Sequence, residues 1–376
     1  MTHKLRLLYL VSTDAYFLSH RLPIALGALD AGFEVLVAGL DTGHGIEIEQ
    51  HGFKFLPLYA LQRTGMNPFN DLKAMTEIAK IYEKYKPDIV HHVALKPVLY
   101  GSIAAFLNQI PRTINALTGL GYVFISKNPF IQCLRFIIML AFRLLFQRKG
   151  TTLIVQNQDD YQKFSCFLTG DQIALIRGSG VDTALFSPSK TFPQNTPLKL
   201  ALVARMLWDK GIGETIDAIR ILQKKNIPVQ FILCGTPDPE NPRSIDENIL
   251  KKWHAAGLCT WVGHQNDIVG LYQSVDAAIL PSYREGLPKS LLEAASCGLP
   301  IITSDVPGCR EVVQDKENGF LVTITPGAIA EAISRLLNLS PEDRQKMGQQ
   351  SREYACKEFA IPLIVKKTLA LYSELK

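Results

Sequence analysis

The chain of 376 residues lacks features that mark several classes of protein. Its seven cysteines are scattered and include no CxxC pair, which argues against a zinc site and a disulfide framework. We therefore expect reduced thiols in a cytosolic setting. The apolar run near the N-terminus is followed by no small-residue cleavage site, so we interpret it as a first strand and not a signal peptide.

Acidic residues are absent from Ile89 to Gln158, and the excess behind the formal net charge of +5 lies within residues 1–197. This bias predicts an anionic partner for the N-terminal half, although a basic solvated face with no partner would give the same pattern. No nucleic-acid-binding motif accompanies the stretch, so we expect no nucleic-acid partner. The basic residues in it are Lys96, Arg112, Lys127, Arg135, Arg143, Arg148 and Lys149.

Short apolar runs alternate with helical patterns in both halves, which is typical of α/β proteins with doubly wound parallel sheets. We predict two Rossmann-like domains, 1–190 and 197–354, facing each other across a cleft; a loop rich in Pro, Ser and Asn lies between them. The C-terminal segment 355–376 is a candidate to pack back on the first domain. The expected strands are RLLYLVS, FEVLVAGL, FKFLPLYAL, DIVHHVAL, RTINAL, TTLIVQN and IALIRG, then KLALVARM, VQFILCG, CTWVG, AAILPS, PIITSD and GFLVTI.

The most apolar segment, Phe130–Phe146, is short for a membrane-spanning helix and is interrupted by Arg135 and Arg143. On a helical wheel the two arginines fall in one arc with two glutamines, while Phe, Ile and Leu occupy most of the rest. A basic amphipathic helix of this kind suits an anionic membrane surface, so we expect Phe130–Lys149 to lie on one. The alternative is a helix packed in the domain core.

Charged residues gather at the expected carboxyl ends of strands in the second half, where ligands of such sheets bind. Arg205 ends one strand, and Lys210 follows at the next helix start. The stretch YREGLPKSLLEAASCGLP begins at Tyr283 as a loop and becomes a helix whose N-terminus we place at Gly286–Lys289. Two cations and a helix N-terminus fit a diphosphate, and Glu293 inside the helix fits a ribose diol. Taken alone, these residues would be surface cations and an exposed helix glutamate.

Arg205 and Lys210 followed by two glutamates with seven residues between them resemble the signature of family 4 retaining glycosyltransferases of the GT-B fold. The resemblance covers essentially the whole chain. It implies that Arg205 and Lys210 bind the diphosphate of a nucleotide-sugar donor. It also implies that Glu285 contacts the donor sugar and Glu293 the ribose, with Arg205, Lys210 and Glu285 forming the catalytic set.

The same resemblance assigns backbone contacts in the donor site. The backbone at Gly286 and Leu287 would contact phosphate, and the loop at Gly263 and His264 would border the nucleobase, unless His264 is an ordinary loop histidine. No D-x-D motif occurs in the chain. This agrees with the family's metal-independent chemistry, in which fixed positive charge stabilises the leaving diphosphate, so we expect no metal and no cofactor.

The acceptor is expected in the N-terminal half. Many relatives carry a histidine before a glycine-rich loop after the fifth strand, but this chain has Thr118 before Gly119 and Gly121. A threonine at this position can offer only a hydroxyl hydrogen bond. Its glycines could let the backbone approach a phosphate or sugar closely, or the loop could be an ordinary turn.

Other N-terminal residues are candidates for acceptor binding. Ser12–Asp14 follows the first strand, and Arg21 and Lys96 are plausible contacts for an acceptor phosphate. His91 and His92 are adjacent on a strand and must point to opposite faces, so they are poor evidence for a metal site. A buried histidine with a satisfied hydrogen bond is the better interpretation.

We therefore expect a transferase that moves a hexose or N-acetylhexosamine from a UDP-sugar to a polyprenyl-diphosphate-linked saccharide for bacterial surface polysaccharides such as O-antigen. It would be peripheral at the cytoplasmic face of the inner membrane. Alternatives are a soluble transferase acting on a small sugar or glycan, and a catalytically silent membrane partner subunit. A sugar-nucleotide epimerase would share the architecture, but the paired glutamates argue against it.

Overall fold

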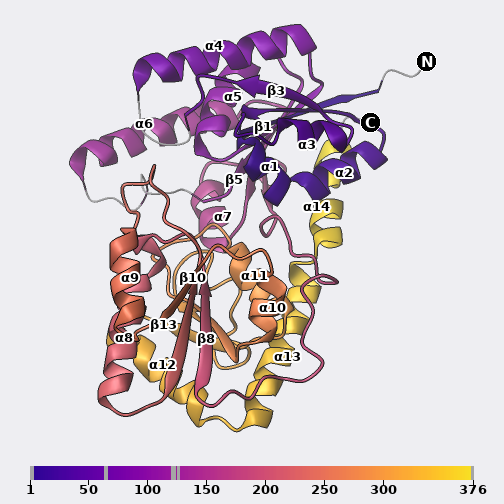
Figure 1. Ribbon diagram of the computed structural model, residues 1–376. Coiled ribbons are helices and arrows are strands. Elements are labelled where there is room, and N and C mark those ends of the chain that lie inside the picture. Colours follow the sequence, from indigo (N-terminus) through magenta and orange to yellow (C-terminus); the bar gives the residue numbers. More distant parts are fainter. Residues whose placement is uncertain (1–3, 63–66, 120–123, 125–127, 374–376) are drawn as a thin grey trace. The chain divides into compact units, whose positions relative to one another are not determined.

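The computed structural model describes residues 4–62, 67–119, 124 and 128–373 and divides into two compact units. The first comprises Met1–Ser179 and Pro362–Lys376, and the second Gly180–Ile361. Each unit holds one parallel sheet with helices on both faces (Figure 1). The predicted α/β class is thus confirmed.

The first unit has a seven-stranded sheet in the order β3-β2-β1-β4-β5-β6-β7. Each expected run forms a strand, and neighbouring strands pair in parallel. The chain starts at the centre and reverses direction between β1 and β4, which is the doubly wound pattern. The strands are β1 (Arg6–Thr13), β2 (Glu34–Leu40), β3 (Lys54–Leu58), β4 (Ile89–Val93), β5 (Arg112–Leu117), β6 (Thr151–Val155) and β7 (Ile173–Leu175).

Helices cover both faces of this sheet with separate apolar clusters. One face packs against α1 (Asp14–His20), α2 (Leu22–Asp30), α3 (Gly45–Gln50) and α14 (Ile361–Ser373). The other packs against α4 (Pro68–Tyr85), α5 (Leu95–Leu107), α6 (Pro129–Phe146) and α7 (Gln158–Ser165). Two helices, α1 and α2, follow β1; they meet at Arg21, and Pro23 lies in the first turn of α2, where proline is favoured.

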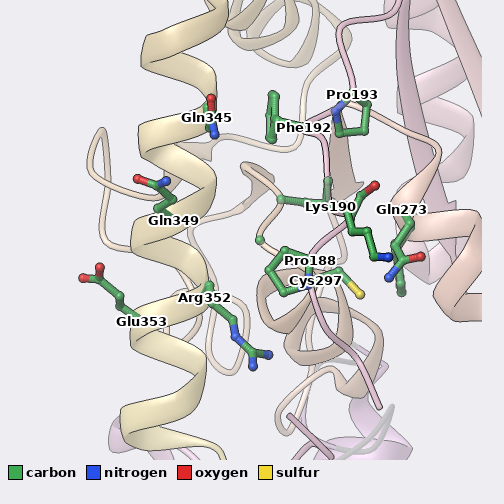
Figure 2. A pocket seen from close by; sticks show the side chains of 14 residues that line it. Pro188, Lys190, Phe192, Pro193, Gln273, Cys297, Gln345, Gln349, Arg352 and Glu353 are labelled. Atoms are coloured by element: carbon green, nitrogen blue, oxygen red, sulfur yellow. The ribbon is translucent and has the colours of Figure 1, made fainter. Parts of the chain in front are cut away.

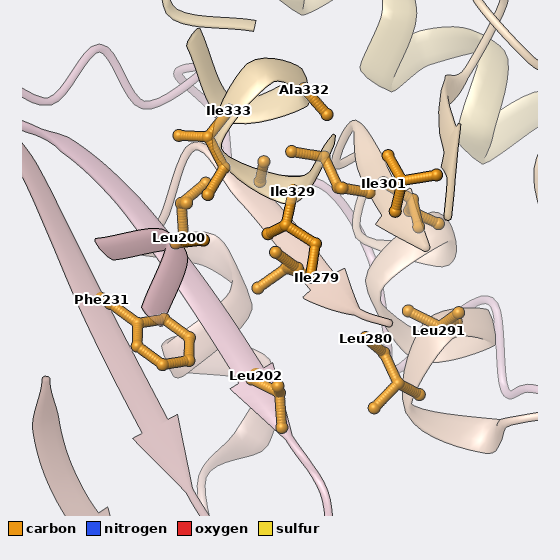
Figure 3. Packing of buried hydrophobic residues seen from close by; sticks show 14 of the residues in the cluster. Leu200, Leu202, Phe231, Ile279, Leu280, Leu291, Ile301, Ile329, Ala332 and Ile333 are labelled. Atoms are coloured by element: carbon orange, nitrogen blue, oxygen red, sulfur yellow. The ribbon is translucent and has the colours of Figure 1, made fainter. Parts of the chain in front are cut away.

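The second unit has a six-stranded parallel sheet in the order β10-β9-β8-β11-β12-β13. Its core is dominated by Leu, Ile and Val, some of which Figure 3 shows between the sheet and α12. The strands are β8 (Leu198–Val203), β9 (Val229–Cys234), β10 (Thr260–Gly263), β11 (Ala277–Leu280), β12 (Ile301–Ser304) and β13 (Gly319–Val322). The helices are η2 (Trp208–Lys210, a 3₁₀ turn), α8 (Ile212–Lys224), α9 (Glu247–Ala255), α10 (Ile268–Gln273), α11 (Lys289–Ser296), α12 (Pro326–Asn338) and α13 (Pro341–Glu358).

A polar residue followed by proline starts four of the longer helices. Asn67, Asn128, Thr325 and Ser340 each accept a hydrogen bond from a backbone N–H of the first turn of α4, α6, α12 and α13. The proline that follows has no N–H to leave unsatisfied and has a backbone angle suited to a helix. These dipeptides therefore fix helix starts locally, before tertiary packing acts.

The C-terminal helix α14 packs on the first unit, whereas residues 355–361 of the predicted segment 355–376 belong to the second unit, which begins at Gly180 and not near residue 197. Tyr372 of α14 is fully buried and hydrogen-bonds through its hydroxyl to that of Tyr9 at 3.0 Å and to Nδ1 of His91. Gly27 of α2 lies close enough to Val365 that a Cβ at Gly27 would stand 2.6 Å from a Val365 methyl. The last element of the chain therefore completes the core of the first unit.

Replacing Tyr372 with alanine should destabilise the first unit by about 3–5 kcal/mol, because a fully buried ring and its hydrogen bonds are lost. The matched control is Tyr59→Ala, since Tyr59 is 80% exposed and its loss should change stability by less than about 0.5 kcal/mol. Urea denaturation measures both. Equal stability of the two variants would contradict this account of α14.

Candidate active site

Three strands of the second sheet carry predicted donor-site residues at or shortly after their carboxyl ends. β10, β9, β8 and β11 are consecutive in the sheet and parallel. Gly263 ends β10, Arg205 lies shortly after β8, and Glu285 lies shortly after β11. Parallel strands end at a common edge, so the topology brings these residues to one side of the sheet.

The turn that carries Lys210 is tied to the loop that carries Glu285. The backbone carbonyl of Asp209 accepts hydrogen bonds from the Ser282 hydroxyl at 3.0 Å and from the Tyr283 N–H at 2.9 Å. Gly211 has a φ of +71°, and a Cβ there would stand 2.1 Å from the carbonyl oxygen of Pro281. Only glycine allows this approach, so the two loops meet through backbone contacts.

Lys210 and Glu285 form an ion pair between the Lys210 ammonium and a carboxylate oxygen of Glu285. Only 17% of the Lys210 side chain and 14% of the Glu285 side chain is exposed. The structure thus brings two predicted site residues into direct contact. An ammonium has three donors and a carboxylate has about four acceptor positions, so each retains capacity for a ligand.

The Glu285 loop is also held by glycine Gly308, which sequence reasoning did not select. A Cβ on Gly308 would stand 2.5 Å from the carbonyl oxygen of Glu285, and its φ is +82°. Glu285 in turn donates its N–H to the carbonyl of Pro307 at 3.3 Å. The Pro307–Gly308 pair after the strand β12 was the available sequence signal.

Arg205 pairs with a residue that sequence reasoning missed. Its Nη1 lies 2.5 Å from Oδ2 of Asp238, in the loop that follows β9. The loop GTPDPENP follows the strand β9 at the same edge of the sheet as Arg205. The place of Asp238 just after a strand was the sequence signal that could have identified it.

The helix α11 begins at Lys289, at the end of the predicted Gly286–Lys289 start. Gly286 and Leu287 precede it, and Pro288 occupies the N-cap without a side-chain capping hydrogen bond. A helix N-terminus of this kind offers backbone N–H donors and a positive dipole end to an anion.

Glu293 lies in the second turn of α11 and is 13% exposed at its side chain. Burial raises its pKa to about 7, against the opposing effect of the Lys289 ammonium 3.7 Å away. A carboxyl with this pKa exchanges its proton near neutral pH. It can therefore accept or donate hydrogen bonds to a diol.

The loop after β10 is exposed. Gly263 has a φ of +65°, and its carbonyl accepts a hydrogen bond from the N–H of Gly235 at 2.8 Å. His264 follows it on the surface. The two residues lie next to the β9 loop that carries Asp238.

Three predicted acceptor residues lie at the carboxyl ends of neighbouring strands in the first unit. Ser12 is near the end of β1, Lys96 is in the first turn of α5 after β4, and Thr118 follows β5. Lys96 forms an ion pair with Asp71 at 3.1 Å. Gly119 is half-buried with a φ of +138°, and Gly121 lies outside the described residues.

Asp14, which directly follows β1, and Arg21 are both buried in the first unit. The Asp14 carboxylate accepts backbone N–H groups of Ala15, Thr42 and His44 at 2.7–2.8 Å and the Thr42 hydroxyl. Burial acts to raise the pKa of Asp14, but these hydrogen bonds outweigh it and hold the pKa below its usual value. Arg21 is 3% exposed where α1 meets α2.

The histidine pair is structural, as the sequence indicated. Both rings are fully buried, and they face opposite sides of the sheet. His91 contacts Tyr372 of α14, whereas His92 bonds to Tyr82 of α4 at 2.8 Å and to Asn115 at 2.7 Å. In the part of the chain that the structure describes, no group of three or more His, Cys, Asp or Glu could hold a metal ion.

A cavity of about 470 Å³ lies elsewhere in the second unit. Side chains of α13 line it together with the segment 188–193 and the C-terminal end of α11 (Figure 2). None of the predicted donor-site residues lines it. The cavity lies at the C-terminal end of α11, whereas Glu285 of the Lys210–Glu285 pair shortly precedes the N-terminus of that helix.

Sequence comparisons identify the family of the chain. The family described as glycosyl transferases group 1 matches residues 186–354, and the family described as glycosyl transferase 4-like matches residues 6–157. The chain belongs to the family 4 glycosyltransferases and has the GT-B fold. It is therefore an enzyme, and the two matches together cover most of this transferase.

Three similar proteins indicate the range of the family. The N,N'-diacetylbacillosaminyl-diphospho-undecaprenol alpha-1,3-N-acetylgalactosaminyltransferase of Campylobacter jejuni is 28% identical over 345 residues, covering 89% of each chain. The UDP-Gal:alpha-D-GlcNAc-diphosphoundecaprenol alpha-1,3-galactosyltransferase of Escherichia coli is 25% identical, covering 68% of this transferase and 67% of the relative. The crystal structure of HepE from Anabaena in complex with UDP has a TM-score of 0.77 at 18% identity, covering 98% and 100% of the chains.

The stability of the transferase should depend on pH through Glu293. Its folded pKa of about 7 lies above the ordinary value of 4.5, so the stability that its protonation gives is present below pH 4.5 and is lost as pH rises through 7. Glu293→Gln mimics the protonated acid. The variant should match the wild type near pH 4.5 and exceed it by up to about 3 kcal/mol near pH 8.

Free energies of unfolding at the two pH values test this difference. The control is Glu247→Gln, because Glu247 is an exposed helix glutamate that also pairs with a lysine four residues away. It should show no such gain at the higher pH. A Glu293→Gln variant that parallels the control would show that burial does not perturb Glu293.

Proposed function

We propose that this glycosyltransferase moves a hexose or N-acetylhexosamine from a UDP-sugar to a polyprenyl-diphosphate-linked saccharide, with retention of configuration and without a metal ion. The observation that carries the proposal is the buried Lys210–Glu285 ion pair beside the start of α11. This ion pair places a cation that can bind phosphate next to a carboxylate that can bind sugar hydroxyls.

The acceptor class is supported by the relatives. The names of the Campylobacter jejuni and Escherichia coli relatives both specify a saccharide on an undecaprenol diphosphate. The second also specifies a UDP-sugar, and HepE was solved with UDP. By similarity we assign a lipid-linked acceptor and a UDP-sugar donor, in bacterial surface polysaccharide biosynthesis.

The donor diphosphate would bind to fixed positive charge. Arg205 presents a guanidinium that is half-exposed, and its planar fork suits phosphate oxygens. The Lys210 ammonium and the N–H groups at the start of α11 supply further donors. Charge fixed in this way can stabilise the leaving diphosphate without a metal ion.

Transfer would proceed on one face of the donor sugar. The bond between the anomeric carbon and the diphosphate oxygen breaks, and the acceptor hydroxyl oxygen bonds to the same face of that carbon. The departing diphosphate takes up the acceptor proton. Glu285 is held by Lys210 and would bind sugar hydroxyls, which supports a role as a sugar contact and not as a covalent nucleophile.

The helix α6 supports peripheral membrane attachment because it has two apolar faces. One face packs Ile138, Phe142 and Phe146 into the core of the first unit. For this face, the alternative of a helix packed in the domain core is correct. The other is exposed. Its side chains, with their exposed fractions, are Phe130 (85%), Phe136 (70%), Ile137 (57%), Leu140 (50%) and Leu144 (68%).

The charge around α6 favours an anionic surface as its partner. Arg143 on α6 and Lys149 shortly after it are exposed, and no acidic residue occurs in the sequence from Ile89 to Gln158. Each such cation contributes about 1 kcal/mol near an anionic bilayer. By length and composition α6 is also the one helix in the described residues that could cross a membrane. Its packed core face favours a helix that lies in the interface at the cytoplasmic face of the inner membrane.

Arg205→Ala and Lys210→Ala should each lower turnover about 10²–10³-fold, because each removes a charge that stabilises the leaving diphosphate. Transfer of a labelled sugar from UDP-sugars to lipid extract measures this. The control is Arg220→Ala, which removes an arginine from an exposed ion pair on α8. Near-normal turnover in the Arg205 and Lys210 variants would remove the donor-site assignment.

Ile137→Glu should reduce binding to vesicles of anionic phospholipid at least about tenfold, because it places a carboxylate on the exposed apolar face of α6. Ile46→Glu is the matched control, since Ile46 is 73% exposed on α3, on the other face of the sheet. Co-sedimentation with vesicles measures both. A wild-type protein that stays wholly in the supernatant would favour a soluble transferase.

A further inference from the structure

We propose that Asp238 is a positioning residue that aims the Arg205 guanidinium at the donor diphosphate. The inference rests on the proposed function, because it concerns the residue that would bind the diphosphate. It adds a member to the donor site that the paired-glutamate signature does not contain.

The two side chains of this pair differ sharply in exposure. Nη1 of Arg205 lies 2.5 Å from Oδ2 of Asp238, yet 54% of the Arg205 side chain is exposed against 9% for Asp238. An ordinary surface pair, such as Asp217 with Arg220, has both partners about half exposed. Here one side of the guanidinium is anchored on a buried carboxylate, and the rest faces outward with further N–H donors.

The loop that carries Asp238 is fixed to the segment that carries Arg205. Thr236 accepts the N–H of Met206 at 3.0 Å, and the carbonyl of Met206 accepts the N–H of Ile245 at 2.8 Å. The carbonyl of Arg243 accepts the N–H of Trp208 at 2.9 Å. The loop therefore pairs like a short strand along residues 206–208, so the two side chains have little freedom to separate.

Asp238 is also held within its own loop. Its N–H donates to the Ser244 hydroxyl at 2.9 Å, and its carbonyl accepts the N–H of Asn241 at 2.9 Å. At the loop start, Gly235 has a φ of +137°, and a Cβ there would stand 1.9 Å from the carbonyl of Ala204. This approach, which glycine alone permits, sets the loop against the residue that precedes Arg205.

The charges explain why such an anchor would matter for a diphosphate. A free arginine side chain has many rotamers, and holding it in one reduces the entropy lost on ligand binding. The Asp238 carboxylate contacts the Arg205 guanidinium directly. Without Arg205, this carboxylate would leave negative charge at the place where phosphate would bind, and it should repel the ligand.

A double-mutant cycle with UDP as the probe tests the pairing. Isothermal titration calorimetry would compare the wild type with Asp238→Ala, Asp238→Asn, Arg205→Ala and the double variant Arg205→Ala/Asp238→Ala. Asp217→Ala is the control, because it breaks an aspartate–arginine pair on the surface of α8. Thermal unfolding of each variant shows whether it is folded.

We expect Asp238→Ala to weaken UDP binding about threefold to tenfold, and Asp238→Asn to restore it to within about twofold because the amide oxygen still accepts the Arg205 hydrogen bond. Arg205→Ala should weaken binding further. Adding Asp238→Ala to that variant should strengthen binding at least about threefold, since the negative charge beside the ligand is gone. The control should bind as the wild type does.

Two results would overturn the inference alone: Asp238→Ala binding UDP like the wild type, or the double variant binding more weakly than Arg205→Ala. The second is what a purely structural role predicts. If the wild type binds neither UDP nor GDP nor ADP, the proposed function fails, and the inference fails with it.

Discussion

The buried ion pair between Lys210 and Glu285 is the contact on which the donor site depends. It joins the turn after β8 to the loop after β11, which are adjacent strands of one parallel sheet. Backbone hydrogen bonds to Asp209 and the close approach at Gly211 hold the two loops together around it. A charge pair this buried is stable only where its surroundings fix its geometry. The pair therefore depends on the contacts between the two loops, and it also links the loops.

A second cation is held by the same means on the other side of β8. Arg205 forms an ion pair with Asp238, as Lys210 does with Glu285, so each predicted phosphate-binding cation contacts a carboxylate before any ligand binds. Preorganised charge of this kind costs little reorganisation when a ligand arrives. The first unit contributes a different surface, the exposed apolar face of α6, whose other face belongs to the core.

The sequence predicted the sheets and part of the site for identifiable reasons. Continuous apolar runs indicate buried parallel strands, and spacing along the chain marked Lys210, Glu285 and Glu293 as candidate site residues. The sequence did not predict contacts between segments that are far apart along the chain. Asp238 follows another strand and is paired with Arg205 only because β8 and β9 are neighbours. The two apolar faces of α6 could not be told apart in the sequence, because the difference depends on what packs against the helix.

In the proposed reaction, a sugar passes from a nucleotide diphosphate to a lipid-linked saccharide. The most direct measurement incubates the full chain with bacterial membrane extract and labelled UDP-, GDP- or ADP-hexoses and N-acetylhexosamines, then follows label into the lipid fraction. We predict incorporation from a UDP-sugar, in a product whose sugar–diphosphate link to the lipid is labile to mild acid. Label found only in water-soluble products, or no transfer from any of these donors, would contradict the claim.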